Sequence, residues 1–279
     1  MEAKDLDINN KDHHVQIADV LDEYTKKSPR VNTPLLFLIK ILGSGDLFRT
    51  KLIAYMRPML IKGVVSLING MKWIYRDTTK SAILTEVLTS MCANMEKEMA
   101  LFPEDEEEQD PTVQMWLYTF LAQHKLRLAK TEEALAHIEK AIAHTPTVVE
   151  LYLIKAKILQ FGGNKAAAVA CTEVARNLDL ADKYLNSLSA KYAFKVDDIT
   201  KANELIAMFA REDDDGKLNC HEMQTMWYED HQGRAYYRQG NYRLAFKQFK
   251  WIKRHIVGAQ EDMTDFFQYG FRKGSYSQS

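Results

Sequence analysis

The sequence of 279 residues contains little glycine, with 12 residues, and little proline, with 6. A β-rich protein needs many tight turns, and these two residue types supply most of them. Cysteine is also scarce, because only Cys92, Cys171 and Cys220 occur and none of them forms a C-x-x-C pair. These counts predict a helical fold with short connections, and free thiols in a reducing compartment.

An excess of one charge and long apolar runs are missing as well. The 37 Lys and Arg residues nearly balance the 38 Asp and Glu residues, which leaves a formal net charge of −1. That balance gives no global electrostatic argument for a nucleic acid or an anionic membrane as a direct partner. No apolar run approaches the roughly 18 residues of a membrane span, and residues 1–14 lack the apolar core of a secretory signal. We therefore expect a cytoplasmic protein.

The sequence does contain an internal repeat. Residues 115–148, "MWLYTFLAQHKLRLAKTEEALAHIEKAIAHTPTV", have the length and pattern of a tetratricopeptide repeat. In this pattern, small residues occur where two packed helices come close together. The small residues of the first two repeats are Ala122, Ala134 and Ala141, followed at the same spacing by Ala156, Ala168 and Ala175. Small residues in register predict consecutive helical hairpins; chance alanines on unrelated helices are the alternative.

The later repeats follow this frame less closely. Ala190 and Ala202 keep two of the three positions in the third repeat, but Phe209 occupies the last one. A further repeat, with Gly233 and Ala245 in pattern order, begins about nine residues late. We therefore predict an all-α protein whose tetratricopeptide-like helical repeats stack as a right-handed α-solenoid.

This reading divides the chain into six segments. In order they are a disordered N-terminal end (1–14), an irregular helical repeat region (15–102), an acidic linker (103–111), three tetratricopeptide-like repeats (112–210), an inter-repeat loop (211–222), and a further repeat with the start of the next (223–275).

The predicted loop at 211–222, "REDDDGKLNCHE", has some features of a twelve-residue calcium loop. Acidic residues fall at its third and fifth positions, Gly216 at the sixth and Glu222 at the twelfth. The first position of such a loop requires a carboxylate, however, and Arg211 places a positive charge there. The insertion also accounts for the slip in the repeat frame. We therefore expect a connection between repeats and no metal site.

No residue pattern indicates catalysis. The eight histidines show no H-E-x-x-H or similar spacing, so we expect each to lie on the surface or at the edge of a helix. The only G-x-G, at Gly43 and Gly45, lacks the rest of a phosphate-binding loop. The expectation is a non-catalytic chain without a cofactor of its own.

Several stretches, in this order, resemble the auxiliary subunit of the N-terminal acetyltransferase A complex. They are "SPRVNTPLLFLIKILGSGDLF" (28–48), "YMRPMLIKGVVSLINGMKWIY" (55–75), "LIKAK" (153–157), "LADKYLNSLSAKYAFK" (180–195) and "NCHEMQTMWYEDHQGRAYYRQGNYRLAFKQF" (219–249). The resemblance covers roughly residues 15–275. Val65 departs from it, because family members usually have proline there.

The resemblance implies a scaffold. In that family the catalytic subunit holds acetyl-CoA, while the auxiliary subunit wraps around it and tethers it to the ribosome. Family members are about three times longer, so we expect this chain to correspond to a middle section or to a truncated relative. A generic tetratricopeptide adaptor that has lost the acetyltransferase partner is the alternative.

The resemblance also implies a ligand. Relatives hold an inositol polyphosphate, such as inositol hexakisphosphate, at the junction of the two subunits. Lys155 and Lys157 on one repeat, with Lys191 and Lys195 on the next, are the residues expected to bind its phosphates as point charges. Gln160 and Leu188 stand where relatives are expected to have further lysines. The alternative is that these lysines are ordinary solvated charges.

Overall fold

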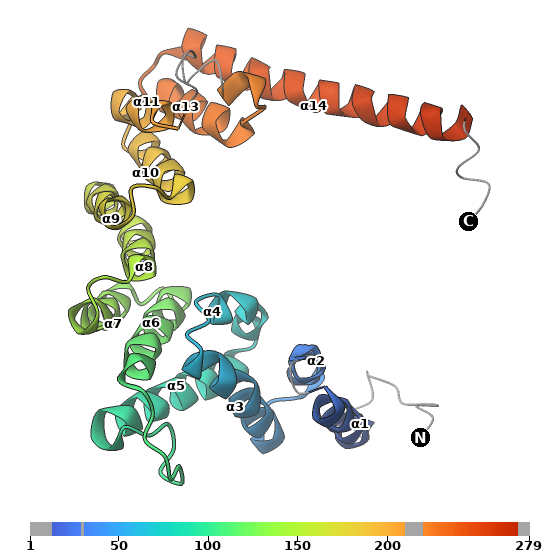
Figure 1. Ribbon diagram of the computed structural model, residues 1–279, viewed down its shortest axis with the longest axis vertical. Coiled ribbons are helices and arrows are strands. Elements are labelled where there is room, and N and C mark those ends of the chain that lie inside the picture. The colour runs from blue at the N-terminus through green and yellow to red at the C-terminus, as the bar shows by residue number, and fades with distance from the viewer. Residues whose placement is uncertain (1–12, 29–30, 210–219, 273–279) are drawn as a thin grey trace. The chain divides into compact units, whose positions relative to one another are not determined.

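The computed structural model describes residues 13–28, 31–209 and 220–272, and these residues contain helices and no strand (Figure 1). The chain forms two compact units, residues 1–158 and 159–279. The helices up to the boundary are α1 (His14–Lys27), α2 (Thr33–Ile41), α3 (Asp46–Ile61), α4 (Leu67–Gly70), the 3-10 helix η2 (Lys72–Arg76), α5 (Thr78–Glu98), α6 (Pro111–Arg127), α7 (Thr131–His144) and α8 (Val149–Phe161), the last of which spans it. The helices of the second unit are α9 (Lys165–Leu178), α10 (Lys183–Lys195), α11 (Ile199–Ala207), α13 (Met226–Arg238) and α14 (Tyr242–Arg272). The predicted all-α class is confirmed.

Side-chain caps define where several helices start. Asp77 accepts hydrogen bonds from the backbone N–H groups of Thr79 and Lys80 at the start of α5. Asn164, Asp182 and Asp198 cap α9, α10 and α11 in the same way. Each cap satisfies backbone donors that the first helical turn leaves without a partner. Local sequence therefore determines the helix starts inside the repeats.

The predicted bounds of two segments, the N-terminal end and the inter-repeat loop, need small corrections. Residues 1–12 of the expected N-terminal end, and 211–219 of the expected inter-repeat loop, lie outside the described residues. His14 is already helical and buried with Ile17 and Ala18, so α1 begins one residue before the predicted start. Cys220 to Glu222, the end of the expected loop, are helical.

The acidic stretch 103–111 is more than a solvated linker. Asp105 is largely buried, accepts a hydrogen bond from Arg57 at 2.6 Å, and accepts another from the backbone N–H of Phe102 at 3.1 Å. Pro111, predicted as the last linker residue, is the first residue of α6, which Asp110 caps. One of the acidic side chains therefore ties the loop to α3, an interaction that charge composition alone does not reveal.

The core of the first unit joins α2, α3, α5, α6 and α7. Its largest fully buried side chains include Phe48, Leu52, Met56 and Phe120. Burying such a side chain is worth roughly 1.5–3 kcal/mol relative to exposing it. Leu47, next to Phe48, is exposed, because the face of α3 turned to the core passes through Phe48, Leu52 and Tyr55.

His124 lies inside this unit, although the histidines were expected on surfaces and helix edges. Its ring is fully buried, with Nδ1 at 2.8 Å from the Tyr75 hydroxyl and Nε2 at 2.8 Å from the Thr85 hydroxyl. The Thr85 hydroxyl donates to the Ser81 carbonyl, so it must accept from Nε2–H. Nδ1 then accepts from Tyr75. A neutral imidazole satisfies both partners and links α6 to α5 and η2.

The second unit has a smaller core of α10, α11 and α13. Phe194 and Tyr228 meet edge to face, with ring centroids 5.7 Å apart, beside Ala190, Ala202 and Ala235. Next in the chain, α13 and α14 pack as an antiparallel pair. The longer helix α14 continues past the first residue of α13 (Figure 1). Among the described residues, no helix has the length and apolarity that crossing a membrane requires.

The burial of His124 predicts a pH dependence of stability. Burial, with lesser effects from Lys125 and Lys130, lowers the pKa of His124 from 6.5 to about 4. Between these values the unfolded chain binds the proton and the folded chain does not. Stability is therefore fully present above pH 6.5 and falls as pH is lowered toward 4, by at most about 1.4 kcal/mol per pH unit. Urea unfolding at a series of pH values, compared with the His124→Gln variant, measures this contribution. An identical pH slope in the two proteins would contradict the assignment.

Gly233 predicts a second effect on stability. A Cβ atom at this position of α13 would lie 2.7 Å from the Phe249 ring of α14. We expect Gly233→Ala to destabilise the second unit by about 1–3 kcal/mol, since the ring must move out of a packed position. Gly258→Ala is the matched control on α14, because an added Cβ there meets nothing within 4 Å. Thermal unfolding should show a lower Tm for the first variant and an unchanged or higher one for the second. Equal Tm values for the two variants would show that α13 and α14 can accommodate an added methyl group at Gly233.

Candidate anion-binding site

The four lysines named for phosphate binding are divided between the two units. Lys155 and Lys157 lie on α8 before the unit boundary, while Lys191 and Lys195 lie on α10 in the second unit. Lys155 is 3.2 Å from a carboxylate oxygen of Glu139 on α7, and Lys157 is exposed. Each pair lies in its own unit, and joint binding of one ligand by all four lysines stays a prediction.

Lys191 and Lys195 are near each other and partly desolvated. The Lys191 ammonium lies 4.5 Å from the centre of the Trp227 ring on α13, and Lys195 lies 4.4 Å from the centre of the Tyr192 ring. Lys195 also donates a hydrogen bond of 2.7 Å to the side-chain oxygen of Gln160. Burial, and secondarily the Lys191 charge, lowers the pKa of Lys195. Two like charges held this way favour an anionic partner.

A pocket of about 370 Å³ opens beside Lys195. Its walls come from the end of α8, the start of α9, the end of α10 and one face of α13. The residues that line it are Gln160, Lys165, Phe194, Lys195, Asp230, His231, Arg234 and Arg238. Gln160, which stands where relatives are expected to have a lysine, thus lines the site and accepts a hydrogen bond from Lys195.

Arg238 fixes one wall of the pocket. Its guanidinium donates to the Phe194 carbonyl at 2.6 Å and to the Asp197 carboxylate at 2.7 Å. Asp197 follows the end of α10 with a positive φ of 65°, and Gln239 donates to its carbonyl. A cation at the last carbonyls of a helix also offsets the negative end of its dipole. Arg238 is therefore occupied in joining α13 to α10.

Arg234 and His231 lie one turn apart on α13. Arg234 pairs with Asp230 through both carboxylate oxygens at 2.9 Å, on an exposed part of the helix. His231 lies 2.8 Å through Nδ1 from the Trp227 carbonyl, to which Nδ1–H donates. Burial lowers the pKa of His231, and the charges of Lys195 and Lys191 act in the same direction. His231 is accordingly neutral near pH 7, and a bound anion would raise its pKa.

Positive charge is in excess around the pocket. Lys165, Lys195, Arg234 and Arg238 line it, and the carboxylates near them are Asp197 and Asp230. Lysine ammonium groups bind phosphate groups, and so do arginines that can exchange an exposed carboxylate partner for a phosphate. The arrangement can hold a polyanion, and the described residues include no group of His, Cys, Asp and Glu suited to a metal ion.

Sequence reasoning did not identify Lys165, His231, Arg234 and Arg238. A signal for the arginines was present, since residues 231–260 contain seven Lys and Arg residues and no Asp or Glu. The repeat pattern directed attention to α8 and α10, whereas the pocket is closed by α13.

The small residues of the repeat pattern all occupy helix contacts. Gly233 is buried, and the alanines are between 0% and 2% exposed. These alanines are Ala122, Ala134, Ala141, Ala156, Ala168, Ala175 and Ala245. Such positions stabilise helix pairs and bind no ligand, which leaves recognition to the exposed side chains.

The fold and the pocket define a helical repeat protein of the tetratricopeptide type, with a basic pocket in its second unit. The chain belongs to the family described as "N-terminal acetyltransferase A, auxiliary subunit", whose model matches residues 1–278. It is 35% identical over 252 residues to the Arabidopsis thaliana N-terminal acetyltransferase A complex auxiliary subunit NAA15, covering 90% of this chain and 27% of that protein. It is 34% identical over 271 residues to the Mus musculus N-alpha-acetyltransferase 16, NatA auxiliary subunit, covering 97% of this chain and 31% of that protein.

A solved relative has the same fold. The structure described as Naa15/Naa10 bound to HypK-THB superposes with a TM-score of 0.84 and 28% sequence identity. The match covers 97% of this chain and 40% of the solved one. The chain thus spans less than half the length of the relatives that it matches, and the resemblance found in the sequence is confirmed.

Proposed function

We propose that this chain is part of a non-catalytic scaffold subunit of the N-terminal acetyltransferase A (NatA) enzyme. In this role it binds the catalytic subunit and supports acetylation of protein N-termini during translation. The observation that carries the proposal is the family match over residues 1–278, together with a solved relative that is described in one complex with Naa10. Catalysis belongs to the partner. The proposal places the chain in the cytoplasm and, through the complex, at the ribosome.

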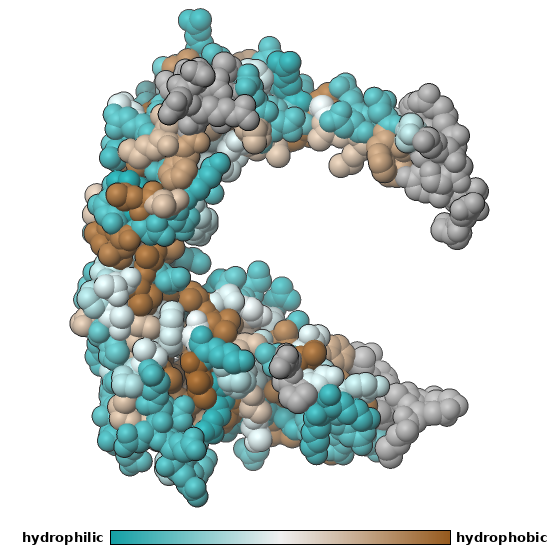
Figure 2. Space-filling view, viewed as in Figure 1, coloured by the Kyte–Doolittle hydropathy of each residue, from teal (hydrophilic) through white to brown (hydrophobic). Residues whose placement is uncertain are grey.

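Exposed apolar side chains support a role in binding a protein. Brown patches gather around α9 in Figure 2. In that part of the chain Phe161 and Leu180 are 60% and 63% exposed, and Val174 and Leu178 are each 43% exposed. Patches of this kind mark protein interaction sites on soluble proteins. A generic tetratricopeptide adaptor without the acetyltransferase partner would use such a surface too.

Co-purification separates these two functions. We expect the tagged chain, co-expressed with the NatA catalytic subunit, to retain it at physiological salt, and to sediment with ribosomes when both are present. Association should be weaker than for a full-length relative, because the chain has about a third of the scaffold's length. The Leu178→Glu/Leu180→Glu variant should weaken it further, whereas Val15→Glu on α1 serves as the control. A well-folded chain that retains no catalytic subunit would favour the adaptor.

We further propose that the basic pocket binds an inositol polyphosphate, with inositol hexakisphosphate as the ligand to test. Lys191 and Lys195 with Lys165 and Arg234 would hold its phosphates in the second unit, and Lys155 and Lys157 are the candidates on α8. The residues fit this ligand in charge, because the cations of the pocket outnumber its carboxylates. A bound polyphosphate would screen the repulsion between neighbouring lysines.

Ligand-induced stabilisation tests this site. In the presence of the catalytic subunit, inositol hexakisphosphate at 100 times its Kd should stabilise the chain by about 2.7 kcal/mol, seen as a higher Tm. Lys191→Ala should reduce the shift, and Lys195→Ala likewise, because each removes a point charge. Lys40→Ala, an exposed lysine of α2, is the matched control and should leave the shift intact. No shift with the wild-type complex would exclude the site.

A further inference from the structure

The first half of α14 has a concentration of basic residues that the rest of the chain lacks. From Tyr242 to Gly258 there are five basic residues and no acidic one, in a protein of net charge −1. They are Arg243, Lys247, Lys250, Lys253 and Arg254. None of the last four forms an ion pair with an Asp or Glu among the described residues, whereas Arg49, Arg57 and Arg234 do. Unpaired cations can bind a new anionic partner without first breaking an existing bond.

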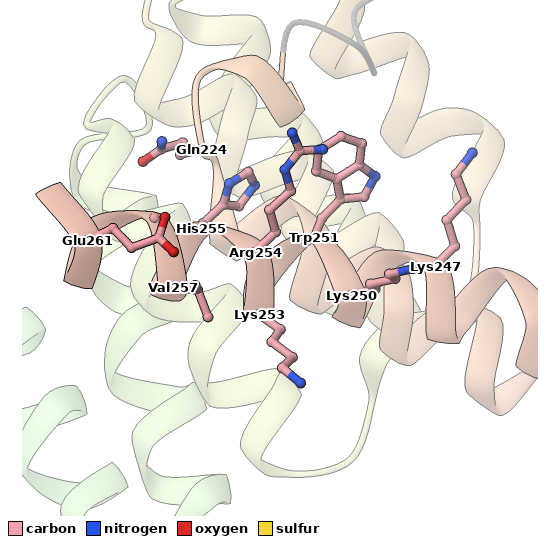
Figure 3. Close-up of a pocket in the computed structure, with 10 residues that line it drawn as sticks. Gln224, Lys247, Lys250, Trp251, Lys253, Arg254, His255, Val257 and Glu261 are labelled. Atoms are coloured by element: carbon pink, nitrogen blue, oxygen red, sulfur yellow. The ribbon is translucent and has the colours of Figure 1, made fainter.

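A groove of about 710 Å³ runs along this part of α14 (Figure 3). The residues of α14 that line it extend from Lys247 through Lys250 and Arg254 to Glu261. At 1.5 Å per residue this face extends about 20 Å. Gln224, from the segment before α13, also lines it. The groove therefore has the length of a short helix and follows the axis of one.

The floor of the groove is aromatic and firmly packed. The Trp251 ring stacks on the His221 ring, with centroids 4.7 Å apart and planes at 16°. The Arg254 guanidinium lies 5.2 Å from its centre, and the His255 ring lies 5.9 Å away. His221 and His255 each place a ring nitrogen 2.8 Å from one carboxylate oxygen of the fully buried Glu229. This network holds Trp251 in place and connects the groove to the interior of the second unit.

These features distinguish between two kinds of anionic partner. Single-stranded nucleic acid binds through bases that stack on exposed aromatic faces. The Trp251 ring already stacks on His221 and has the Arg254 guanidinium 5.2 Å from its centre, so it offers no open stacking platform to a base, although its side chain is only partly buried. A peptide needs only an apolar floor for its own apolar side chains and cations for its carboxylates. Val257, which also lines the groove and is 42% exposed, adds an apolar side chain.

We propose that this groove binds an acidic amphipathic helix of a partner protein. Its carboxylates would pair with Lys247, Lys250 and Arg254, and its apolar side would rest on Trp251 and Val257. The charge along the groove also defines the direction of the ligand, because Glu261 follows the basic residues at the far end. The end of the ligand that lies opposite Glu261 is therefore neutral or basic. This site is separate from the pocket beside Lys195.

Binding of a designed peptide tests the proposal on the full chain. The probe is a fluorescein-labelled peptide of about 15 residues, with Leu at helical spacing and Glu on the remaining positions. We expect saturable binding by fluorescence anisotropy at about 0.15 M salt, and a Kd at least about tenfold higher for Lys250→Glu/Arg254→Glu. Lys40→Glu/Lys72→Glu, two exposed lysines of the first unit, makes the same charge change and should leave the Kd unaltered.

Two further peptides make the result specific. A scrambled peptide of the same composition should bind several-fold more weakly, since it has no continuous apolar side. A version with Lys in place of Glu should bind the charge-reversed Lys250→Glu/Arg254→Glu variant better than it binds the wild type. Circular dichroism confirms that each variant is folded.

Three outcomes would overturn the proposal. They are an absence of binding to the acidic peptide, equal affinity for the variant and its control, and tighter binding of a single-stranded RNA of similar length with the same loss in the variant. The last would assign the groove to nucleic acid.

Discussion

The close approach of paired helices is the constraint on which the rest of this protein depends. In the first unit α6 and α7 pack against each other, and Ala122, Ala134 and Ala141 on these helices have no exposed surface. In the second unit Gly233 of α13 receives the Phe249 ring of α14. A side chain larger than these at such a crossing would hold the helices apart. The exposed faces of each pair, which recognise partners, keep their positions only because the inner faces are this close.

Buried polar contacts then define how neighbouring pairs are joined. His124 connects α6 to α5 and η2 through hydroxyl groups, and its neutral form satisfies both of them. Arg238 connects α13 to the end of α10, and Glu229 connects α13 to α14 through His255. Each of these groups would be costly to leave without a partner inside the protein. They align helices that apolar packing alone would leave free to slide.

Contacts of this kind also determine which cations of the two basic surfaces in the second unit are available to a ligand. Arg238 is bound to a carbonyl and a carboxylate, so it shapes the pocket beside Lys195 without being free to bind. Lys165 and Lys195 have no carboxylate partner among the described residues, which leaves their charge for a ligand. On α14 the stacking of Trp251 on His221 supports the proposal that the groove binds a peptide rather than a base. Availability of a cation, more than its presence, thus distinguishes a site from a structural ion pair.

Much of the architecture follows from local sequence. The spacing of alanines predicted the helical hairpins, the aspartate and asparagine caps placed their first turns, and ordered motifs indicated the family. The interior role of His124, the contact of Asp105 with Arg57, and the convergence of Arg234 with Lys195 did not follow. Each joins residues at least 39 positions apart, and no local pattern encodes such a pair. The sequence by itself therefore determined the repeats and the family. Only the tertiary structure decided which charges are paired and which face solvent, because the partners of Arg57 and Arg238 come from segments distant in the sequence.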